Sequence, residues 1–199
     1  MKTNIILSGV GGQGILTIAA VLDTAALSEN LHVKQSEVHG MSQRGGAVQC
    51  HVRISDKEIF SDLIPEGKAD LILSVEPMEL LRYIPFLNKY GWLITDSHPF
   101  INTDNYPEKS ELLEQIKKHP YHVIINATDI AKKIGNSKTA NMVLLGAASS
   151  IIPLSEKSML EAIKKLFQHK SDKIISLNLE AFFEGKKIAK EMTDLAAKN

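Results

Sequence analysis

Near the start of the chain, the stretch Gly9-Val10-Gly11-Gly12-Gln13-Gly14 joins the apolar run Asn4–Ser8 to a helix-forming run that begins at Ile15. A strand, a glycine turn and a helix in this order favour an α/β fold. The glycines fit the spacing G-x-G-x-x-G, which lets the backbone turn tightly and approach a neighbour closely. The following helix presents unpaired N–H groups and the positive end of its dipole, which suit an anion such as a pyrophosphate.

The composition and net charge of the chain are typical of a globular domain. The chain has 199 residues, of which 44% are hydrophobic and 23% are charged, and these are ordinary values for a globular domain. Lys and Arg together number 23, as do Asp and Glu, so the formal net charge is zero. No excess of basic residues indicates a nucleic-acid partner. We therefore expect residues 1–199 to form a single domain that binds no nucleic acid.

The chain contains one cysteine, Cys50. A disulfide or a cysteine-ligated iron–sulfur cluster within this chain is therefore excluded, and a lone thiol is typical of the reducing cytoplasm. Because Cys50 lies in an apolar strand, we expect it to be a small buried residue and not a nucleophile. No apolar run reaches the roughly 18 residues of a membrane span. The N-terminal run lacks the features of a secretory signal, so we expect a cytoplasmic protein without a membrane segment.

Apolar runs of strand length alternate with helix-forming segments along the first 126 residues. Several runs are continuously apolar and rich in Val, Ile and Leu, which is typical of parallel strands covered on both faces. We expect a Rossmann-like α/β fold, in which helices flank a mostly parallel sheet. The expected strands are Asn4–Ser8, Val33–Val38, Ala47–Ile54, Leu71–Val75, Trp92–Thr95 and His122–Asn126, and the expected helices between them are Ile15–Ser28, Glu76–Asn88 and Ser110–Lys118.

Two regions depart from this alternation. The segments Ala47–Arg53 and Glu58–Ser61 flank the turn-like stretch Ser55-Asp56-Lys57, which predicts a β-hairpin inserted in the α/β core. From about residue 128 to 195 the pattern is helical throughout. The expected helices of this C-terminal region are Thr128–Ile134 with Gly135 as its C-cap, Thr139–Ile151, Ser158–Gln168 and Ile174–Met192.

The glycine turn has two interpretations. It either binds an anion or nucleotide, or it is a tight turn required only for packing. A dinucleotide site also needs an acidic residue at the end of the second strand, and Glu37 lies near that place. The residues after Glu37 do not continue as an ordinary dinucleotide-binding unit, which disfavours NAD as the ligand.

A second glycine-rich loop, Glu37-Val38-His39-Gly40-Met41-Ser42-Gln43-Arg44-Gly45-Gly46, separates the second and third expected strands. A guanidinium in such a loop suits a carboxylate or phosphate with bidentate geometry. The alternatives are an ordinary loop histidine for His39 and a surface ion pair for Arg44. In a doubly wound sheet both glycine-rich loops lie at the same edge, so we expect them to share one site or interface.

Two further positions carry polar side chains beside apolar elements. Asp96 and His98 follow the strand Trp92–Thr95; they form either an acid–base pair or, as we favour, a turn capped by Asp96. Asn141 opens an otherwise apolar helix, and capping of that helix is favoured over a turn toward the site. No catalytic or metal-ligating motif accompanies them, so catalytic residues stay unassigned and no metal site is expected.

Together, the glycine turn, the second glycine-rich loop and the segment Asn141–Gly146 resemble the gamma-subunit family of 2-oxoacid:ferredoxin oxidoreductases. The form His39-Gly40-Met41-Ser42-Gln43-Arg44-Gly45-Gly46 is most similar to the beta subunit of the indolepyruvate branch of that family. The resemblance covers residues 3 to 190, and the second loop is its more specific part.

This resemblance implies a heteromeric enzyme that decarboxylates indolepyruvate or another arylpyruvate, transfers the acyl group to coenzyme A and passes two electrons to ferredoxin. It places thiamine diphosphate and 4Fe-4S clusters in a partner alpha subunit. This chain is expected to hold no cofactor, to be inactive alone, to form a homodimer when isolated, and to shape the active site and the coenzyme A entrance. The residues implied to face ligand or partner are Gly9, Gly11, Gly12, Gln13, Gly14, His39, Arg44, Gly45, Gly46 and Asn141.

Two other classes of function stay open from the sequence. A self-sufficient NAD(P)-dependent enzyme would use the glycine turn and Glu37. A non-catalytic interaction module would use its glycines only for packing.

Overall fold

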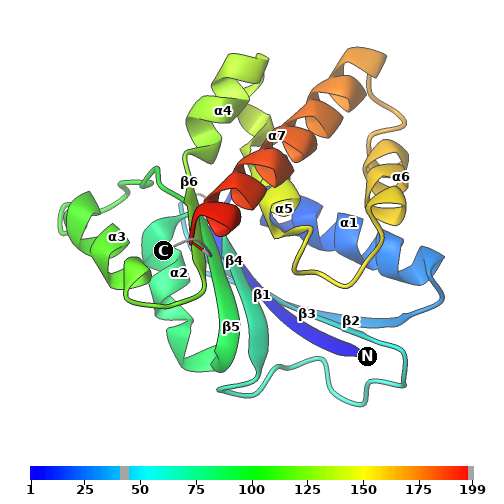
Figure 1. The fold of residues 1–199 in the computed structure, drawn as a ribbon, viewed down its shortest axis with the longest axis horizontal. Coiled ribbons are helices and arrows are strands. Elements are labelled where there is room, and N and C mark those ends of the chain that lie inside the picture. Colours follow the sequence, from blue (N-terminus) through cyan, green and yellow to red (C-terminus); the bar gives the residue numbers. More distant parts are fainter. Residues whose placement is uncertain (41–44, 197–199) are drawn as a thin grey trace.

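The computed structural model describes residues 1–40 and 45–196, whose strands form one six-stranded sheet (Figure 1). The strand order across the sheet is β2-β3-β1-β4-β5-β6. The strands are β1 (Lys2–Val10), β2 (His32–His39), β3 (Ala47–Ser55), β4 (Ala69–Ser74), β5 (Leu87–Asp96) and β6 (His122–Ile125).

The sheet is mixed but mostly parallel, as predicted. β1 is parallel to β4, β4 to β5, and β5 to β6. β3 runs antiparallel to both of its neighbours, β1 and β2. Five of the described strands therefore point the same way, and their carboxyl ends meet at one edge of the sheet.

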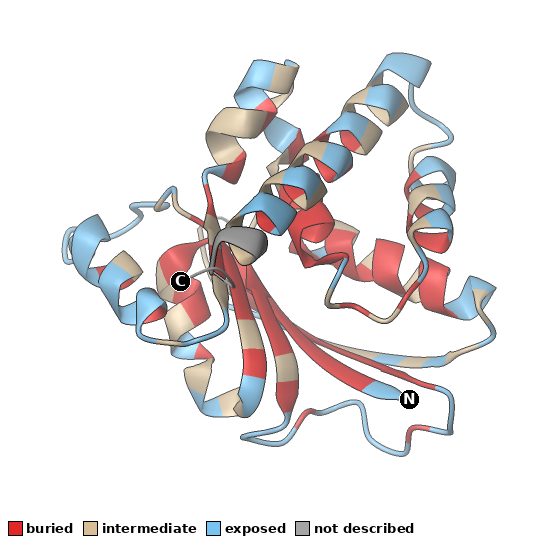
Figure 2. Ribbon diagram, in the orientation of Figure 1, coloured by how far each residue is buried: buried red, intermediate tan, exposed pale blue. Residues whose placement is uncertain are grey.

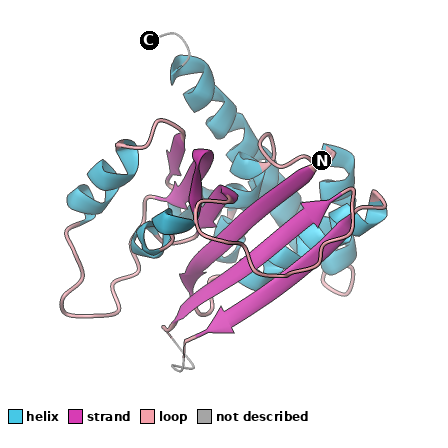
Figure 3. Ribbon diagram, turned by 90° about the horizontal axis from the view of Figure 1, so that it is seen from below, coloured by secondary structure: helices cyan, strands magenta, loops and turns pink. Residues whose placement is uncertain are grey.

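The inserted hairpin lies elsewhere than predicted. Its strands are β2 and β3, in a register that sets Glu37 opposite Cys50. The expected second strand, Glu58–Ser61, is irregular because both edges of β3 are already paired, one with β1 and one with β2. The segment after β3 crosses one face of the sheet instead (Figure 3), where Arg53 donates hydrogen bonds to the carbonyl oxygens of Ser61 (2.7 Å) and Leu63 (2.9 Å).

Helices cover both faces of the sheet (Figure 1). Side chains that alternate along β1 reach a core on each face: Ile5 and Leu7 pack on the larger core with α1 (Ile15–Ser28) and α5 (Ala140–Ala148), and Ile6 packs on the smaller core with α2 (Pro77–Arg82) and α3 (Lys109–Lys117). The described helices are α1 (Ile15–Ser28), α2 (Pro77–Arg82), α3 (Lys109–Lys117), α4 (Ala127–Ile134), α5 (Ala140–Ala148), α6 (Glu156–Leu166) and α7 (Asp172–Ala196), with 3-10 turns η1 (Ile84–Phe86) and η2 (Ser137–Thr139). None of the helices in residues 1–40 and 45–196 has both the length and the apolar character needed to cross a bilayer.

The predicted helix Glu76–Asn88 is wrong in its second half. α2 ends at Arg82, a 3-10 turn follows, and β5 begins at Leu87. Pro85 lies in that turn, and it supplies no N–H and restricts the residue before it, so the α-helix stops early. By contrast, the C-cap at Gly135 is confirmed by its φ of 108°, which is the left-handed conformation.

At the crossing of α5 and α7 the two helix backbones come close together. A Cβ on Gly146 would lie 1.9 Å from the carbonyl oxygen of Phe182, and one on Gly185 would lie 1.8 Å from that of Val143. Figure 2 shows α5 buried along almost its whole length beneath α7. The glycines therefore serve close approach of two helices, a gain that outweighs their low helix propensity.

Candidate functional site

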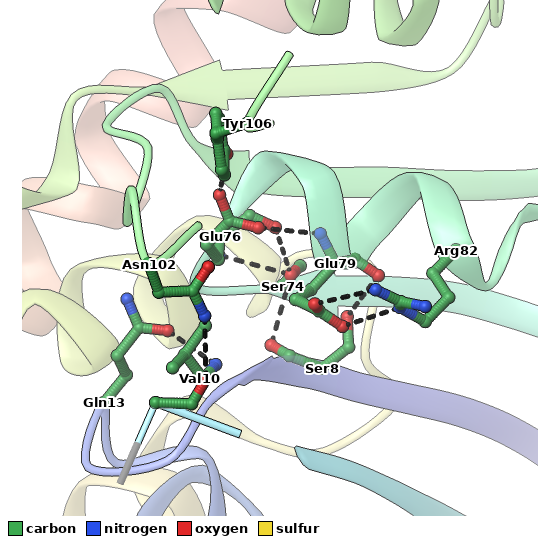
Figure 4. Close-up of polar contacts among 10 residues, drawn as sticks. Ser8, Val10, Gln13, Ser74, Glu76, Glu79, Arg82, Asn102 and Tyr106 are labelled. Carbon is green, nitrogen blue, oxygen red and sulfur yellow. Dashed lines mark hydrogen bonds and ion pairs between the residues drawn. The ribbon is translucent and has the colours of Figure 1, made fainter. Parts of the chain in front are cut away.

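The glycine turn connects β1 to α1 at the edge where the parallel strands end. Gly12 and Gly14 have φ values of 97° and 81°, a conformation that favours glycine. The side chain of Gln13 folds back so that its Oε1 accepts a hydrogen bond from the N–H of Val10 at 2.7 Å (Figure 4). The glycines and Gln13 therefore stabilise the conformation of the turn through contacts within the turn itself.

Asn141 contacts this turn from α5. Its Nδ2 donates to the carbonyl oxygen of Gly14 at 3.1 Å, and its Oδ1 accepts from the N–H of Met142 at 2.9 Å. A Cβ on Gly14 would lie 2.5 Å from that Nδ2. The N-cap of α5 is Thr139, so the interpretation of Asn141 as the helix cap is wrong, and its side chain turns toward the glycine turn.

The second glycine-rich loop lies beside the first. The N–H of Gly11 donates to the carbonyl oxygen of Gly46 at 2.9 Å. His39 lines a hollow of 290 Å³ together with Gly11, Gly12 and Gly14. Arg44, like residues 41–43, lies outside the described residues.

The position of Glu37 disfavours a dinucleotide site. β3 separates β2 from β1, so Glu37 lies two strand spacings from β1, or about 10 Å. Its carboxylate accepts from Gln35 and lies 3.2 Å from Nε2 of His39. In a dinucleotide-binding unit the acidic residue ends the strand next to β1, where it reaches the ribose.

A cavity of 850 Å³ lies on the other side of the glycine turn. Four helices begin at it, and each contributes a residue from its first turn. These residues are Thr17 of α1, Thr128 of α4, Asn141 of α5 and Ile174 of α7. Since the N-terminus of a helix carries partial positive charge, the four starts together make the cavity attractive to anions.

Several backbone N–H groups at the glycine turn and two lysines at the cavity are unpaired among the described residues. The N–H groups of Gly12, Gly14 and Ile15 donate no hydrogen bond to another described residue. Lys138 and Lys170 line the cavity, are exposed, and form no ion pair within the described part of the chain.

Among the described residues that line the cavity, Asp96 provides the one carboxylate, and both of its oxygens accept hydrogen bonds. Its Oδ1 accepts from the N–H of His98 at 3.0 Å, and its Oδ2 accepts from the N–H (3.0 Å) and hydroxyl (2.5 Å) of Thr128. Burial raises the pKa of this carboxyl group, and the three donors oppose that rise. The capping interpretation of Asp96 is thus confirmed, because it binds the backbone of His98 and not the imidazole.

The segment 97–108, which we call the strap, contributes residues 98–101 to the cavity lining. Its anchor is Glu76, which is fully buried and accepts from the hydroxyl of Tyr106 and from the N–H of Phe100 at 3.4 Å (Figure 4). Burial raises the pKa of Glu76 and of Tyr106. At the tip of the strap, Nδ2 of Asn102 donates to the carbonyl oxygen of Gly45 at 2.7 Å, so the strap also holds the second glycine-rich loop.

The sequence reasoning missed the strap and its anchor. Glu76 precedes Pro77, which marks it as a helix cap, and the structure bears this out with a 2.7 Å bond from the N–H of Glu79. Nothing local indicates that the same carboxylate also binds residues 24 and 30 positions later. Within the described residues, no group of three or more His, Cys, Asp or Glu side chains is placed to hold a metal ion.

Comparisons with known proteins agree with this fold. The indolepyruvate oxidoreductase subunit IorB of Thermococcus kodakarensis is 41% identical over 202 residues, which cover 96% of this chain and 98% of that protein. The keto/oxoacid ferredoxin oxidoreductase gamma subunit of Geobacter sulfurreducens superposes with a TM-score of 0.70 at 25% identity, covering 95% of this chain and 99% of that one. A 2-oxoglutarate:ferredoxin oxidoreductase of Magnetococcus marinus, solved with coenzyme A bound, shares the fold with a TM-score of 0.78 at 23% identity, covering 96% of this chain and 31% of that one.

The family described as pyruvate ferredoxin/flavodoxin oxidoreductase matches residues 4–188. That match includes all six strands from Asn4 onward, both glycine-rich loops and the α5–α7 crossing. With so much of the fold and the cavity inside the match, this chain belongs to the pyruvate ferredoxin/flavodoxin oxidoreductase family.

Proposed function

We propose that this chain is a cofactor-free subunit of an indolepyruvate:ferredoxin oxidoreductase. The complete enzyme decarboxylates indolepyruvate or another arylpyruvate, transfers the acyl group to coenzyme A and passes two electrons to ferredoxin. The names of relatives at 34–41% identity over most of the chain support the substrate class. The chain acts only in complex with an alpha subunit that carries thiamine diphosphate and the 4Fe-4S clusters.

The chemistry of this chain agrees with that division. Its one cysteine, Cys50, is fully buried on β3, and burial raises the pKa of the thiol to about 12. Iron–sulfur clusters are held by several cysteine thiolates, so the cysteine content of this chain does not fit a cluster. The electron carriers therefore belong to the partner.

The observation that carries the proposal is the cavity at which four helices begin. Coenzyme A has a diphosphate and a phosphate monoester on an otherwise organic body, so it suits a cavity with converging N–H groups, two lysines and apolar walls. The volume of 850 Å³ lies in the range of small-molecule sites. We assign the glycine turn, with Asn141, to the diphosphate, and we assign His39, Arg44, Gly45 and Gly46 to the shared wall between this ligand and the partner subunit.

Reconstitution tests this proposal. The purified chain is expected to be colourless and inactive, and its mixture with the alpha subunit is expected to reduce ferredoxin only when arylpyruvate and coenzyme A are both present. Iron should be found in the alpha subunit alone. A brown, active preparation of the lone chain would contradict the proposal, as would turnover of the mixture without coenzyme A.

Arg44→Ala tests the assignment of the second loop. If Arg44 faces the ligand, the KM for coenzyme A of the assembled enzyme should rise about tenfold with little change in KM for arylpyruvate. An unchanged KM for coenzyme A would remove Arg44 from the site while leaving the subunit assignment intact.

Three expectations complete the proposal. Residues 1–199 act as one domain, and the enzyme works in the cytoplasm, where a lone thiol stays reduced. The isolated chain associates as a homodimer through a surface that the alpha subunit covers in the complex. Size-exclusion chromatography coupled to light scattering, over a range of concentrations, tests the last point.

A further inference from the structure

We propose that Lys138 and Lys170 form a second anion subsite, which binds the 3′-phosphate of coenzyme A. The inference rests on the proposed function, because it assumes that this cavity takes coenzyme A. It adds that the cavity recognises two separate anionic groups, one at the glycine turn and one at the two lysines.

The two lysines come from separate elements that meet at the cavity. Lys138 is in η2, directly before α5, and Lys170 lies two residues before the first residue of α7. Both backbones are fixed locally: the N–H of Lys138 donates to Oδ1 of Asn136 at 3.1 Å, and the N–H of Lys170 donates to the carbonyl oxygen of Phe167 at 2.8 Å. The two positions are therefore set by the fold, although their side chains are exposed.

The helix α7 places its start at the cavity. Ile174 and Asn178 of α7 line the cavity, and their spacing of four puts them on one face of the helix. Lys170 lines the cavity from the segment just before the helix. Asn178 is buried and donates to the carbonyl oxygen of Ile174 at 2.7 Å, which holds this face in place. Since the start of a helix carries partial positive charge, α7 adds to the charge of Lys170.

Nothing in the described lining neutralises the lysines. The only carboxylate there, Asp96, already accepts from His98 and Thr128. Neither lysine forms an ion pair with a described residue, whereas other exposed lysines such as Lys132 and Lys164 pair with a carboxylate one turn away. Two ammonium groups that are unpaired among the described residues, beside a helix start, favour a phosphate monoester, which carries more negative charge than either phosphate of the diphosphate.

The glycine turn alone does not account for this end of the cavity. The N–H groups that are unpaired among the described residues lie in the glycine turn and at the start of α1, and Asn141 of α5 donates a hydrogen bond to the turn. A ligand with one anionic group would leave the lysines unused. Coenzyme A and its analogue lacking the 3′-phosphate, 3′-dephospho-coenzyme A, differ only in the group that the lysines are proposed to bind.

The test compares these two ligands in the enzyme assembled with its alpha subunit. In the natural enzyme, kcat/KM for coenzyme A should exceed that for 3′-dephospho-coenzyme A by about tenfold or more, the ordinary effect of losing a charge-assisted contact. In the double variant Lys138→Ala/Lys170→Ala, kcat/KM for coenzyme A should fall by about tenfold, and that for the dephospho analogue should change less than about twofold.

Lys173→Ala is the matched control. Lys173 is exposed on the first turn of α7 but does not line the cavity, so this variant removes the same charge from the same region. It should keep the preference for coenzyme A. Because all three lysines are exposed, thermal melting should show that the variants remain folded.

The outcomes separate the inference from the proposed function. If the assembled enzyme turns over without coenzyme A, the proposed function fails. If turnover requires coenzyme A but the double variant keeps the natural preference, or the natural enzyme has none, the subsite is overturned and the proposed function survives. If Lys173→Ala abolishes the preference for coenzyme A equally, any positive charge in this region suffices for the preference, and the subsite is likewise overturned.

Discussion

The cavity edge and the α5–α7 crossing both require glycine, but a side chain would meet different obstacles in the two regions. At the crossing, a Cβ on Gly146 would collide with a backbone carbonyl oxygen 1.9 Å away. At the cavity edge, a Cβ on Gly14 would meet the amide of the Asn141 side chain at 2.5 Å. A side chain rotates away at modest cost, whereas the backbone of a packed helix does not.

The two regions also differ in their polar groups. The crossing lies between helices whose facing residues are apolar and buried. The cavity edge keeps N–H groups and lysines that are unpaired among the described residues, and it carries a strap held by hydrogen bonds. The difference indicates that the crossing holds the fold together, while the cavity edge gives up some stability to keep donors free for a ligand.

The largest expected effect is at the crossing. Gly146→Ala should lower the free energy of unfolding by about 3 kcal/mol, because the new methyl group forces α5 and α7 apart. Thermal or urea unfolding measures the loss, and Lys187→Ala, on the exposed surface of α7, is the control. A stability within about 0.5 kcal/mol of the natural chain would show that the helices separate easily, and the contrast with the cavity edge would disappear.

The next effect is at Gly14. Gly14→Ala should cost about 1–2 kcal/mol, from the positive φ and from the contact with Asn141. The double variant Gly14→Ala/Asn141→Ala should be less destabilised than the sum of the single variants, since the shortened side chain removes the collision. Strict additivity would mean that the backbone conformation accounts for the whole loss. Unlike Gly146→Ala, this variant should also raise the KM for coenzyme A of the assembled enzyme.

Local features of the sequence predicted much of the fold. α1 has its predicted bounds, and the six predicted strands each overlap an observed one, because apolar runs and glycine or proline signals are read over a few residues. The position of β3 between β1 and β2 was not predictable in this way. Its pairing with β1 joins segments far apart in the chain. The segment Glu58–Ser61 has an apolar residue, Ile59, which resembles a strand pattern but is buried without belonging to a strand.

The candidate site was predictable in parts and not as a whole. The sequence marked Gly14 and Asn141 separately, but their contact spans 127 positions and depends on how α5 packs. No local pattern indicates the strap, since Glu76, Asn102 and Tyr106 belong to no motif and the bonds that hold the strap join distant positions. Long-range contacts of this kind follow from the assembled core, which a local pattern does not encode.

The strap allows a finer test of the cavity edge. Tyr106→Phe removes the hydroxyl that donates to Glu76 and should lower the free energy of unfolding by about 1 kcal/mol. It should also speed proteolytic cleavage within residues 97–108, because the anchor is weakened while α5 and α7 are untouched. Tyr90→Phe, an exposed tyrosine on β5, is the control. Unchanged cleavage would mean that the bond from the N–H of Phe100 suffices to hold the strap.

The smallest expected effect on stability concerns Asp23. This residue lies on α1, which starts at the cavity edge and packs on the larger core. Its Oδ1 is buried without a hydrogen-bond partner among the described residues, and burial, with the nearby charge of Glu37, raises its pKa from 3.8 to about 6. Between about pH 4 and 6 the folded chain thus binds more protons than the unfolded chain, so this group lowers stability as the pH rises through that window.

Asp23→Asn should remove that loss. The free energy of unfolding should increase by about 0.5–1 kcal/mol at pH 7 to 8, a value reduced from the full pKa shift because solvent screens part of the carboxylate. It should also vary less between pH 4 and 6. Glu180→Gln, which removes an exposed carboxylate from α7, controls for net charge. If Asp23→Asn instead destabilises the chain at pH 7 to 8, the carboxylate of Asp23 has a favourable partner. The buried charge on α1 would then stabilise the fold.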